Sequence, residues 1–330
     1  MRLKRLLRQV ERNLQRVMDL LLGPILAPVV SYMARTGVGT NASMKRNCLP
    51  MPVHYYSPVP DVKDLESRNI WQRRSKLGGI DLYPGEQRKL LQLLGQRYGL
   101  ECDWQYQKPE DPFMYHTSTT NFSYGCAAIT HSLIRHFKPK RVIEIGSGNS
   151  SKVIAHALKL NFAEDKASSF DYTVIDPFPR SPVSDGLPGL NNLIRERVEL
   201  VEPDLFENLA ANDILFIDSG HTIRTGGDVN YLILDVLPRL SEGVLIHFHD
   251  IPLPADYPKT YFTNPSFRVF WTEAYLLQAF MSFNDTFKVL LAMAYLMSDH
   301  LDAFADAYPN YNPKIHILSS SSFWIQRVKG

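Results

Sequence analysis

From about Phe122 onward, the sequence predicts an α/β fold in which a mostly parallel sheet is covered by helices on both faces. Short apolar runs of strand length alternate with amphipathic runs of helical length, which is typical of parallel strands buried on both sides. A glycine-rich turn follows the first apolar run, and an aspartate ends the second. Ligands bind beyond the carboxyl ends of such strands, so we expect the chemistry there.

Hydrophobic periodicity places the elements in order along the chain. One helix is expected upstream of the sheet, at Gly85–Tyr98. The expected strands are Arg141–Ile145, Tyr172–Ile175, Val198–Val201, Ile214–Ile217, Gly243–Phe248, Phe287–Ala292 and Ser321–Val328. The expected helices of this region are Ser123–Phe137, Ser150–Leu160, Asp228–Leu237 and Arg268–Phe283.

Composition narrows the class of protein. The chain has 330 residues, of which 45% are hydrophobic, so it can bury a large core. Its 36 Lys and Arg nearly balance 34 Asp and Glu, giving a net charge of +2, so no nucleic-acid partner is expected. Cys48, Cys102 and Cys126 are widely spaced and form neither a disulfide framework nor a zinc pattern, which favours the reducing cytoplasm.

The N-terminus combines a basic and an apolar segment. Residues 1–16 alternate basic and apolar side chains in the pattern of an amphipathic helix. Residues 17–34 are mostly apolar but contain Asp19, Pro24 and Pro28, so they are short for a spanning helix and fit a signal peptide poorly.

Two interpretations of this segment stay open. It is either a helix or partly ordered arm that packs on the protein, or a peripheral membrane contact made by residues 1–34. The second would place the protein at the inner face of a membrane. Composition divides the chain into an arm and linker at 1–50, an extension at 51–120 that packs on the catalytic domain, and that domain at 121–330. The sequence does not indicate an oligomeric state.

The turn after the first strand has the features of a ligand loop. Gly146, Ser147 and Gly148 follow the strand, and glycines let the backbone approach a ligand closely. A dinucleotide fingerprint would place glycine or alanine at Ser151. Asp176 ends the second strand, where a carboxylate can accept both hydroxyls of a ribose. The alternatives are an ordinary turn and a capping acid.

These residues carry a resemblance. The segments 142–148 (ValIleGluIleGlySerGly) and 174–177 (ValIleAspPro) resemble the first two motifs of class I S-adenosylmethionine-dependent methyltransferases. The resemblance implies a Rossmann-like, doubly wound, seven-stranded sheet with an antiparallel final strand. It also implies that the glycines approach S-adenosylmethionine, that Glu144 lies near its methionine end, and that Asp176 holds its ribose.

Ionisable residues follow two further strands. The fourth strand leads into Asp218 and His221, and the fifth leads into His249 and Asp250. If these strands are neighbours, the four side chains converge on one rim. Oxygen and nitrogen ligands suit a divalent cation, which would lower the pKa of a substrate hydroxyl while a histidine takes its proton. The alternative is loop capping and polar packing, and His247 is expected to be a packed core histidine.

A narrower resemblance covers most of the chain after about residue 50. The segments that carry it are 54–58, 78–82, 213–251, 271–280 and 321–326. Together they are similar to the "methyltransferase domain 24" group.

The Asp218-x-x-His221 spacing is similar to that of metal-dependent O-methyltransferases that modify macrolide sugars. This resemblance implies that Asp218 and Asp250 are metal ligands and that His221 is the general base. His249 stands where those enzymes carry a carboxylate. That change favours manganese over magnesium as the cation at Asp218, His249 and Asp250, or it means that no metal binds.

The sequence therefore predicts a methyltransferase that uses S-adenosylmethionine to methylate a hydroxyl of a sugar, a glycan or a small natural product. Tyr257, Tyr261 and Trp271 follow the fifth strand and are expected to cover such an acceptor or to pack as a lid. One alternative is an NAD-dependent oxidoreductase, which Ser151 disfavours. Another is a non-catalytic, membrane-associated binding protein, which the retained acids and histidine disfavour.

Overall fold

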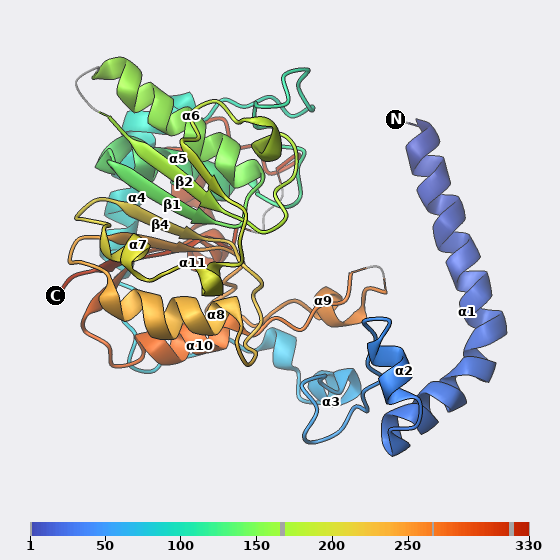
Figure 1. The fold of residues 1–330 in the computed structure, drawn as a ribbon. Helices are drawn as coiled ribbons and strands as arrows, with labels where there is room; N and C mark the ends of the chain where they lie inside the picture. Colours follow the sequence, from blue (N-terminus) through green and yellow to red (C-terminus); the bar gives the residue numbers. More distant parts are fainter. Residues whose placement is uncertain (1, 166–168, 266, 317–319, 330) are drawn as a thin grey trace. The chain divides into compact units, whose positions relative to one another are not determined.

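The computed structural model describes residues 2–165, 169–265, 267–316 and 320–329, without the side chains of residues 2–9, 11 and 12. The chain forms two compact units, which we call the N-terminal unit (up to residue 70, with 262–270) and the sheet unit (71–261 and 271–330). The sheet and every candidate site residue lie in the sheet unit (Figure 1). The predicted division at residues 50 and 120 stays a prediction.

The sheet unit has the predicted Rossmann-like architecture. Its seven strands have the order β3-β2-β1-β4-β5-β7-β6. They are β1 (Arg141–Ile145), β2 (Asp171–Ile175), β3 (Asn192–Ile194), β4 (Ile214–Ile217), β5 (Leu245–Phe248), β6 (Phe287–Ala292) and β7 (Phe323–Arg327). The strand β7 is antiparallel to β5 and β6, while the pairs among β1 to β5 are parallel. The antiparallel final strand is therefore confirmed.

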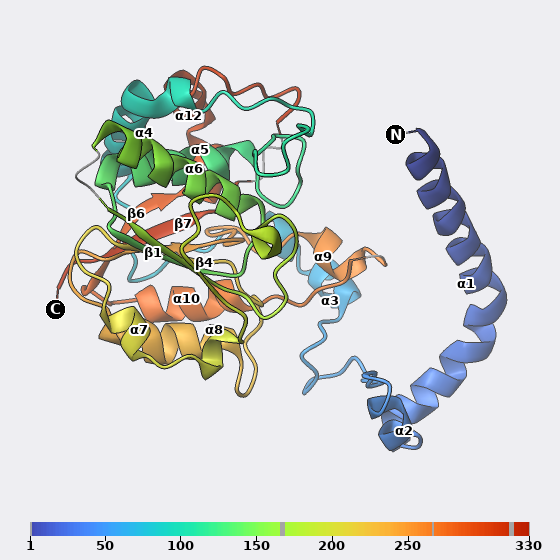
Figure 2. The same ribbon diagram turned by 45° about the horizontal axis from the view of Figure 1, so that its top comes forward.

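Helices cover both faces of the sheet (Figures 1 and 2). One face carries α4 (Pro84–Tyr98), α5 (Tyr124–Phe137), α6 (Asn149–Glu164) and α12 (Leu301–Ala307). The other carries α7 (Asp204–Glu207), α8 (Asp228–Asn230), which continues as π- and 3-10-helical turns to Arg239, and α10 (Glu273–Met281). The remaining α-helices are α1 (Arg2–Thr36), α2 (Thr40–Met44), α3 (Val62–Ser67), α9 (Lys259–Thr263) and α11 (Met293–Asp299).

The third strand is not where the sequence predicts it. Residues Val198–Leu200 form a 3-10 turn, and Asn192–Ile194 pairs with β2 instead. A hydrogen bond to the neighbouring strand aligns this short edge strand: the side-chain oxygen of Asn191 accepts from the backbone N–H of Tyr172 at 2.9 Å. An asparagine disfavours strands in general, so apolar periodicity points to the following segment.

The predicted helix Arg268–Phe283 is also too long, because α10 begins only at Glu273. The backbone N–H groups of Thr272 and Glu273 both donate to the carbonyl oxygen of His221, at 2.8 and 3.1 Å. A helix leaves its first N–H groups without internal partners, and here the loop after β4 supplies one. The start of α10 is thus set by a tertiary contact.

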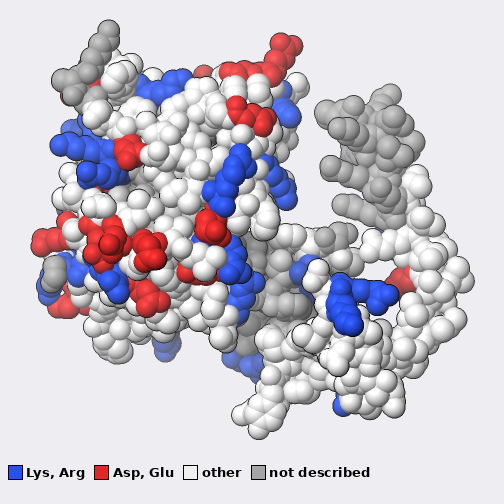
Figure 3. All heavy atoms as spheres, in the orientation of Figure 1, with Lys and Arg blue, Asp and Glu red and all other residues white. Residues whose placement is uncertain are grey.

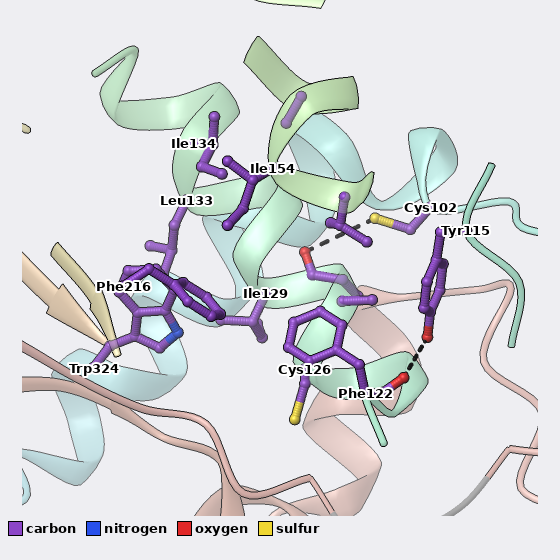
Figure 4. Packing of buried hydrophobic residues seen from close by; sticks show 14 of the residues in the cluster. Cys102, Tyr115, Phe122, Cys126, Ile129, Leu133, Ile134, Ile154, Phe216 and Trp324 are labelled. Atoms are coloured by element: carbon purple, nitrogen blue, oxygen red, sulfur yellow. Dashed lines mark hydrogen bonds between the residues drawn. The ribbon is translucent and has the colours of Figure 1, made fainter. Parts of the chain in front are cut away.

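The core of the sheet unit lies against α5. Every residue of that helix from Tyr124 to Arg135 is buried. Figure 4 shows Phe216 of β4 and Trp324 of β7 beside this helix, with ring centroids 6.1 Å apart. The same figure shows Tyr115, whose hydroxyl donates to the carbonyl oxygen of Phe122 at 2.7 Å. The segment before the sheet is therefore part of the same core.

The N-terminal unit contains one long helix. The helix α1 continues through Asp19, Pro24 and Pro28, so it extends beyond the apolar stretch expected at residues 17–34. Its segment Asn13–Thr36 is long and apolar enough to cross a membrane by length and composition, and none of the apolar window is buried. Most side chains of the predicted amphipathic part, residues 1–16, lie outside the described residues.

A buried arginine links α5 to the turn after α4. The side chain of Arg135 is 3% exposed, and its Nε atom lies 2.8 Å from a carboxylate oxygen of Glu101. The Nε2 atom of His131 lies 2.7 Å from the same oxygen. Burial raises the pKa of Glu101, but the hydrogen bonds from His131 and Arg135 outweigh it and lower the pKa to about 2.

We predict that Glu101→Gln lowers the free energy of unfolding by about 1.5–3 kcal/mol at neutral pH, because it removes a charge-assisted hydrogen bond from a buried arginine. A depressed carboxyl pKa stabilises the fold above the unfolded pKa of 4.5 and ceases to do so as the pH falls toward about 2. The difference from the unsubstituted protein should therefore shrink as the pH falls below about 4.5.

Urea unfolding at pH 7, 4.5 and 3 measures this difference. Glu164→Gln is the matched control, because Glu164 contacts the same arginine from the surface and should cost less. An equal loss at pH 7 and pH 3 would contradict the assignment, as would a larger effect of the control.

Candidate functional site

The glycine loop brings the ends of three strands together. The backbone N–H of Gly146 donates to the carbonyl oxygen of Ile175 at the end of β2, at 2.9 Å. Gly146 has a φ of +80°, and a Cβ atom there would lie 2.1 Å from the carbonyl oxygen of Asp218, just after β4. Only glycine combines this left-handed conformation with so close an approach. The glycine loop is thus held in direct contact with Asp218, which follows β4.

The helix α6 begins directly after the loop. The backbone N–H of Gly148 donates to the hydroxyl oxygen of Ser151 at 3.0 Å, and Ser151 is buried. The serine at the position of a third glycine therefore caps the loop from inside the helix. A glycine there would leave this N–H without its side-chain acceptor.

Ser147 and Asp176 meet beside the loop, and the role of Asp176 as a ribose ligand stays a prediction. The hydroxyl of Ser147 donates to one carboxylate oxygen of Asp176 at 2.5 Å. The backbone N–H of Phe178 donates to the other oxygen at 2.8 Å. Asp176 remains half-buried, so its carboxylate stands at the surface next to the two glycines, where a hydroxyl of a ligand can replace that of Ser147.

Glu144 points into the interior. It is fully buried, accepts a hydrogen bond from the hydroxyl of Ser150 at 2.6 Å and another from the hydroxyl of Tyr172. Burial raises the pKa of Glu144 to about 7, although these hydrogen bonds lower it. The carboxylate thus joins β1, β2 and α6 beneath the loop. Its expected place near the methionine end of a cofactor stays a prediction.

The ionisable residues after β4 and β5 converge, because these strands are neighbours in the sheet. The Nε2 atom of His221 lies 3.2 Å from Oδ1 of Asp218 and 3.8 Å from Oδ2 of Asp250. The Nδ1 atom of His249 lies 3.6 and 3.3 Å from the same two oxygens. Candidate ligand atoms of Asp218, His221 and Asp250 all lie within 4.8 Å of one another. We call these four residues the rim cluster.

The rim cluster fits a divalent cation. His249 is 4% exposed, and neither of its ring nitrogens has a hydrogen-bond partner among the described residues. Its Nδ1 atom faces two carboxylates, and ligand atoms that share one such ion lie about 3 to 3.5 Å apart. Mixed carboxylate and imidazole ligands suit manganese better than magnesium. Burial lowers the pKa of His249, but the carboxylates of Asp218 and Asp250 outweigh it and raise the pKa well above its usual value.

Glu273 is a site residue to which sequence reasoning assigned no role. It is 1% exposed, and one of its carboxylate oxygens lies 2.7 Å from Nδ1 of His221. The ring of Trp271 packs on this imidazole, with centroids 4.4 Å apart. The sequence places Glu273 inside the predicted helix Arg268–Phe283 and in the segment 271–280 that carries a resemblance. A glutamate among apolar residues at the start of a helix was the available signal.

The loop after β4 is fixed to this helix by its backbone as well. His221 adopts a left-handed φ of 55°, and Asp250 one of 56°. Such conformations are uncommon outside glycine and concentrate at functional sites. The carbonyl oxygen of His221 accepts from the N–H groups of Thr272 and Glu273, so the strained residue is held at both its backbone and its ring.

Charge in the rim cluster follows from this packing. Burial lowers the pKa of His221, but the hydrogen bonds to Asp218 and Glu273 outweigh it and raise the pKa to about 10. Burial likewise opposes the charge of Asp218, yet His249 and His221 hold the pKa of that carboxyl below its usual value. Without a cation, His221 is therefore an imidazolium at neutral pH.

His247 is the packed core histidine that the sequence predicts. It is fully buried, its ring stacks on Phe216 with centroids 3.7 Å apart, and its Nε2 atom lies 3.0 Å from the hydroxyl of Ser322. Burial lowers the pKa of His247 well below the usual value. This histidine stays neutral and belongs to the sheet.

A cavity of about 640 Å³ adjoins the rim cluster. His249 and Asp250 form part of its lining. Tyr257 and Tyr261, which the sequence placed over the acceptor, line another wall, whereas Trp271 packs on His221 instead. The remaining lining comprises Trp71, Gln72, Arg73, Arg74, Thr120, Asn121, Ser123, Pro252, Pro254, Ala255, Asp256, Pro258, Ala294, Met297, Ser298, Ser320 and Ser321.

Comparison with known proteins supports the resemblance noted in the sequence. A family described as "Methyltransferase domain" matches residues 143–251, the segment that carries the glycine loop and the rim cluster. An uncharacterized protein from Archaeoglobus fulgidus is 32% identical over 174 residues, which are 49% of this chain and 75% of that protein.

Two solved structures are more distantly similar. An apo structure described as CmcI-N160 has a TM-score of 0.35 at 15% identity and covers 62% of this chain and 71% of its own. The methyltransferase PaMTH1 of Podospora anserina, bound to S-adenosylhomocysteine, has a TM-score of 0.36 at 15% identity, with coverages of 84% and 99%. These scores are too low to support an inference.

We predict that Glu273→Gln lowers the pKa of His221 from about 10 toward its ordinary value of 6.5, because one of the two carboxylates that stabilise the imidazolium is lost. A raised histidine pKa stabilises the fold fully below the unfolded pKa, and this contribution is lost as the pH rises toward about 10. The substitution should therefore destabilise the protein at neutral pH and do so less at pH 10.

Titration of the histidine ring signals by NMR, with chelator present, measures this pKa. Glu207→Gln is the control, because Glu207 is a surface acid that pairs with Arg239 and should leave His221 unchanged. An unaltered pKa in Glu273→Gln would show that Glu273 does not hold the imidazolium.

Proposed function

Because the chain belongs to the class I S-adenosylmethionine-dependent methyltransferases, we propose that it methylates a hydroxyl group of a sugar, a glycan or a small natural product. The observation that carries this proposal is the rim cluster, which lies at the ends of β4 and β5. The glycine loop follows β1, the strand beside β4. Methyl donor and proton acceptor would thus occupy adjacent strand ends.

The cofactor would bind over the glycine loop. Gly148 leaves the backbone open there, since a Cβ atom at this residue would meet nothing within 4 Å, whereas the Cβ direction of Gly146 is occupied by Asp218. The ribose hydroxyls would donate to Asp176 in place of Ser147, which already shows that this carboxylate accepts a hydroxyl. Glu144 would support the loop from the interior through Ser150 and Tyr172.

His221 is the proposed general base. In the reaction the bond between the donor sulfur and the methyl carbon breaks, the acceptor oxygen bonds to that carbon, and the hydroxyl proton leaves. Glu273 holds Nδ1 of His221, so Nε2 is the atom that can take the proton. In this structure Nε2 lies 3.2 Å from Oδ1 of Asp218. For His221 to be neutral and to accept a proton at Nε2, the carboxylate of Asp218 must bind another group.

Asp218, His249 and Asp250 would hold a divalent cation, manganese in preference to magnesium. When bound, the cation supplies an electrostatic pull that lowers the pKa of the acceptor hydroxyl. The role of the protein is to present three ligand atoms from two strand ends in one place. With Asp218 engaged as a ligand, the imidazolium of His221 would lose one of the carboxylates that stabilise it.

The cavity beside Asp250 is the proposed acceptor pocket. The rings of Tyr257 and Tyr261 lie nearly parallel, with centroids 6.2 Å apart. The indole N–H of Trp71, another lining residue, donates to the carbonyl oxygen of Tyr257 at 3.0 Å and fixes the position of this segment. Aromatic walls with a few polar groups suit a sugar or another ring that carries hydroxyls. We place the reaction in the cytoplasm, where the three free cysteines stay reduced.

We predict that Asp176→Ala weakens the binding of S-adenosylhomocysteine at least tenfold, because two hydrogen bonds from the ribose to a carboxylate are lost. His221→Ala should leave this affinity nearly unchanged while it reduces methyl transfer. Isothermal titration calorimetry on protein freed of carried-over ligand measures the affinity. No binding to the unsubstituted protein would contradict the proposed cofactor, and equal losses in both variants would place His221 in the cofactor pocket.

We also predict that manganese binds the protein with release of protons and with an affinity that rises with pH. His221 and His249 are held protonated by their carboxylate neighbours, so a cation must compete with their protons. Calorimetry in two buffers of different ionisation enthalpy counts the protons. Asp218→Asn and Asp250→Asn should abolish binding, and Asp256→Asn in the same cavity should not. Full methyl transfer in excess chelator would exclude a metal role.

A further inference from the structure

The helix α1 exposes apolar side chains on all sides. Within it, Leu20 is 80% exposed and Ile25 is 65% exposed. The apolar window of the segment Asn13–Thr36 is 0% buried. On the side drawn in Figure 3, most of the described part of this helix shows no charged side chains. A helix that is apolar all round belongs in a protein core or in a membrane, not in water.

If α1 were straight, its length would be sufficient to cross a bilayer. The segment Asn13–Thr36 has 24 residues, which as a helix measure about 36 Å, against a hydrocarbon core of about 30 Å. From Leu20 to Ala34 there is no charged residue. Tyr32 lies near the end of this stretch, and Tyr55 and Tyr56 are almost fully exposed in the same unit. Tyrosines of this kind are enriched where membrane meets water.

Both flanks of the apolar stretch are basic. Residues 1–16 contain six Lys or Arg and one Glu. Residues 35–50 contain Arg35, Lys45 and Arg46 and no acid. Basic flanks stay on the cytoplasmic side of a membrane, where they also meet anionic headgroups. The charges therefore oppose the passage of either flank across the bilayer.

The cellular location of the cofactor also favours a sheet unit on the cytoplasmic side. The sheet unit follows the second flank, and a methyltransferase needs the cytoplasmic supply of S-adenosylmethionine, an argument that rests on the proposed function. A single span would place either the six basic residues or the sheet unit on the far side. The positive charges disfavour the first arrangement and the proposed function disfavours the second, so both ends of α1 should lie on one side.

The helix α1 is bent, as entry and exit at the same membrane face require. Pro24 and Pro28 lie inside α1, where each removes a backbone hydrogen bond and bends the helix. Figures 1 and 2 show that α1 is curved along its length. The arm before Pro24, from Val17 to Gly23, measures about 10 Å, less than one leaflet of the hydrocarbon core. The bend therefore falls within the cytoplasmic leaflet.

We propose that α1 anchors the protein to a membrane by entering and leaving the lipid at the same, cytoplasmic face. The acceptor would then be drawn from molecules that reach this surface. In this proposal the apolar helix is surrounded by lipid. If α1 instead packs against a second copy of the chain, or is removed by a signal peptidase, the tests below would reveal it.

The first test measures membrane association of the full chain in bacterial cells. We expect the protein to stay in the membrane fraction after an alkaline carbonate wash. Leu21→Arg and Ile25→Arg, in the middle of the apolar stretch, should reduce the membrane-bound fraction at least roughly tenfold. Leu14→Arg, the same change of charge in the basic flank, should behave like the unsubstituted protein.

Binding of S-adenosylhomocysteine by the released Ile25→Arg variant shows whether the sheet unit is folded. Release of the unsubstituted protein by the wash would overturn the proposal. So would equal retention of all variants, a membrane-bound chain whose mass shows that α1 has been removed, or a lipid-free soluble dimer.

The second test determines on which side each flank lies. Cys48 is exposed in the second flank, whereas Cys102 and Cys126 are buried, so an impermeant maleimide reports on Cys48. A Cys48→Ser, Asn13→Cys variant reports on the first flank. We expect both cysteines to be protected in spheroplasts and labelled in inverted vesicles. Labelling of either one from outside would overturn the same-side insertion, and the result does not depend on the identity of the acceptor.

Discussion

The contact between Gly146 and the carbonyl oxygen of Asp218 is the constraint on which the rest of the site depends. It requires a residue without a Cβ atom in a left-handed conformation, and it holds the loop after β1 against the loop after β4. Asp218 is fixed in this way, and His221 after β4 and His249 after β5 lie around it. The cofactor loop and the rim cluster are therefore parts of a single packing arrangement, and a change in either would displace the other.

Much of this arrangement could be predicted because its residues directly follow the strands of the sheet. Apolar runs such as IleLeuPheIle at 214–217 mark buried strands directly, and the polar residue after each strand falls at one edge of the sheet. The sequence thus placed Asp176, Asp218 and Asp250 correctly at the edge where ligands are expected. It also predicted His247 as a packed core histidine, and its ring stacks on Phe216.

The remainder depends on contacts that sequence patterns do not encode. Glu273 reaches His221 across 52 positions of chain, and its role follows only from the packing of α10 against the loop after β4. Glu144 has the same residue type and a conspicuous motif, yet it is directed into the sheet by Ser150 and Tyr172. The short edge strand β3 and the start of α10 were misplaced for the same reason: a side chain or carbonyl elsewhere in the fold determines where each begins.

The chain leaves the sheet unit after Tyr261 and returns to it at Trp271, and the rings of these two residues touch, with centroids 4.9 Å apart. When the two ends of a loop are held together, a change in loop length alters the entropy cost of closing the loop only slightly. Insertions or deletions between these aromatic residues would therefore be tolerated by the sheet and by His221. This is a natural insertion point at which relatives of the protein could acquire new peripheral structure while the chemistry beside it remains unaltered.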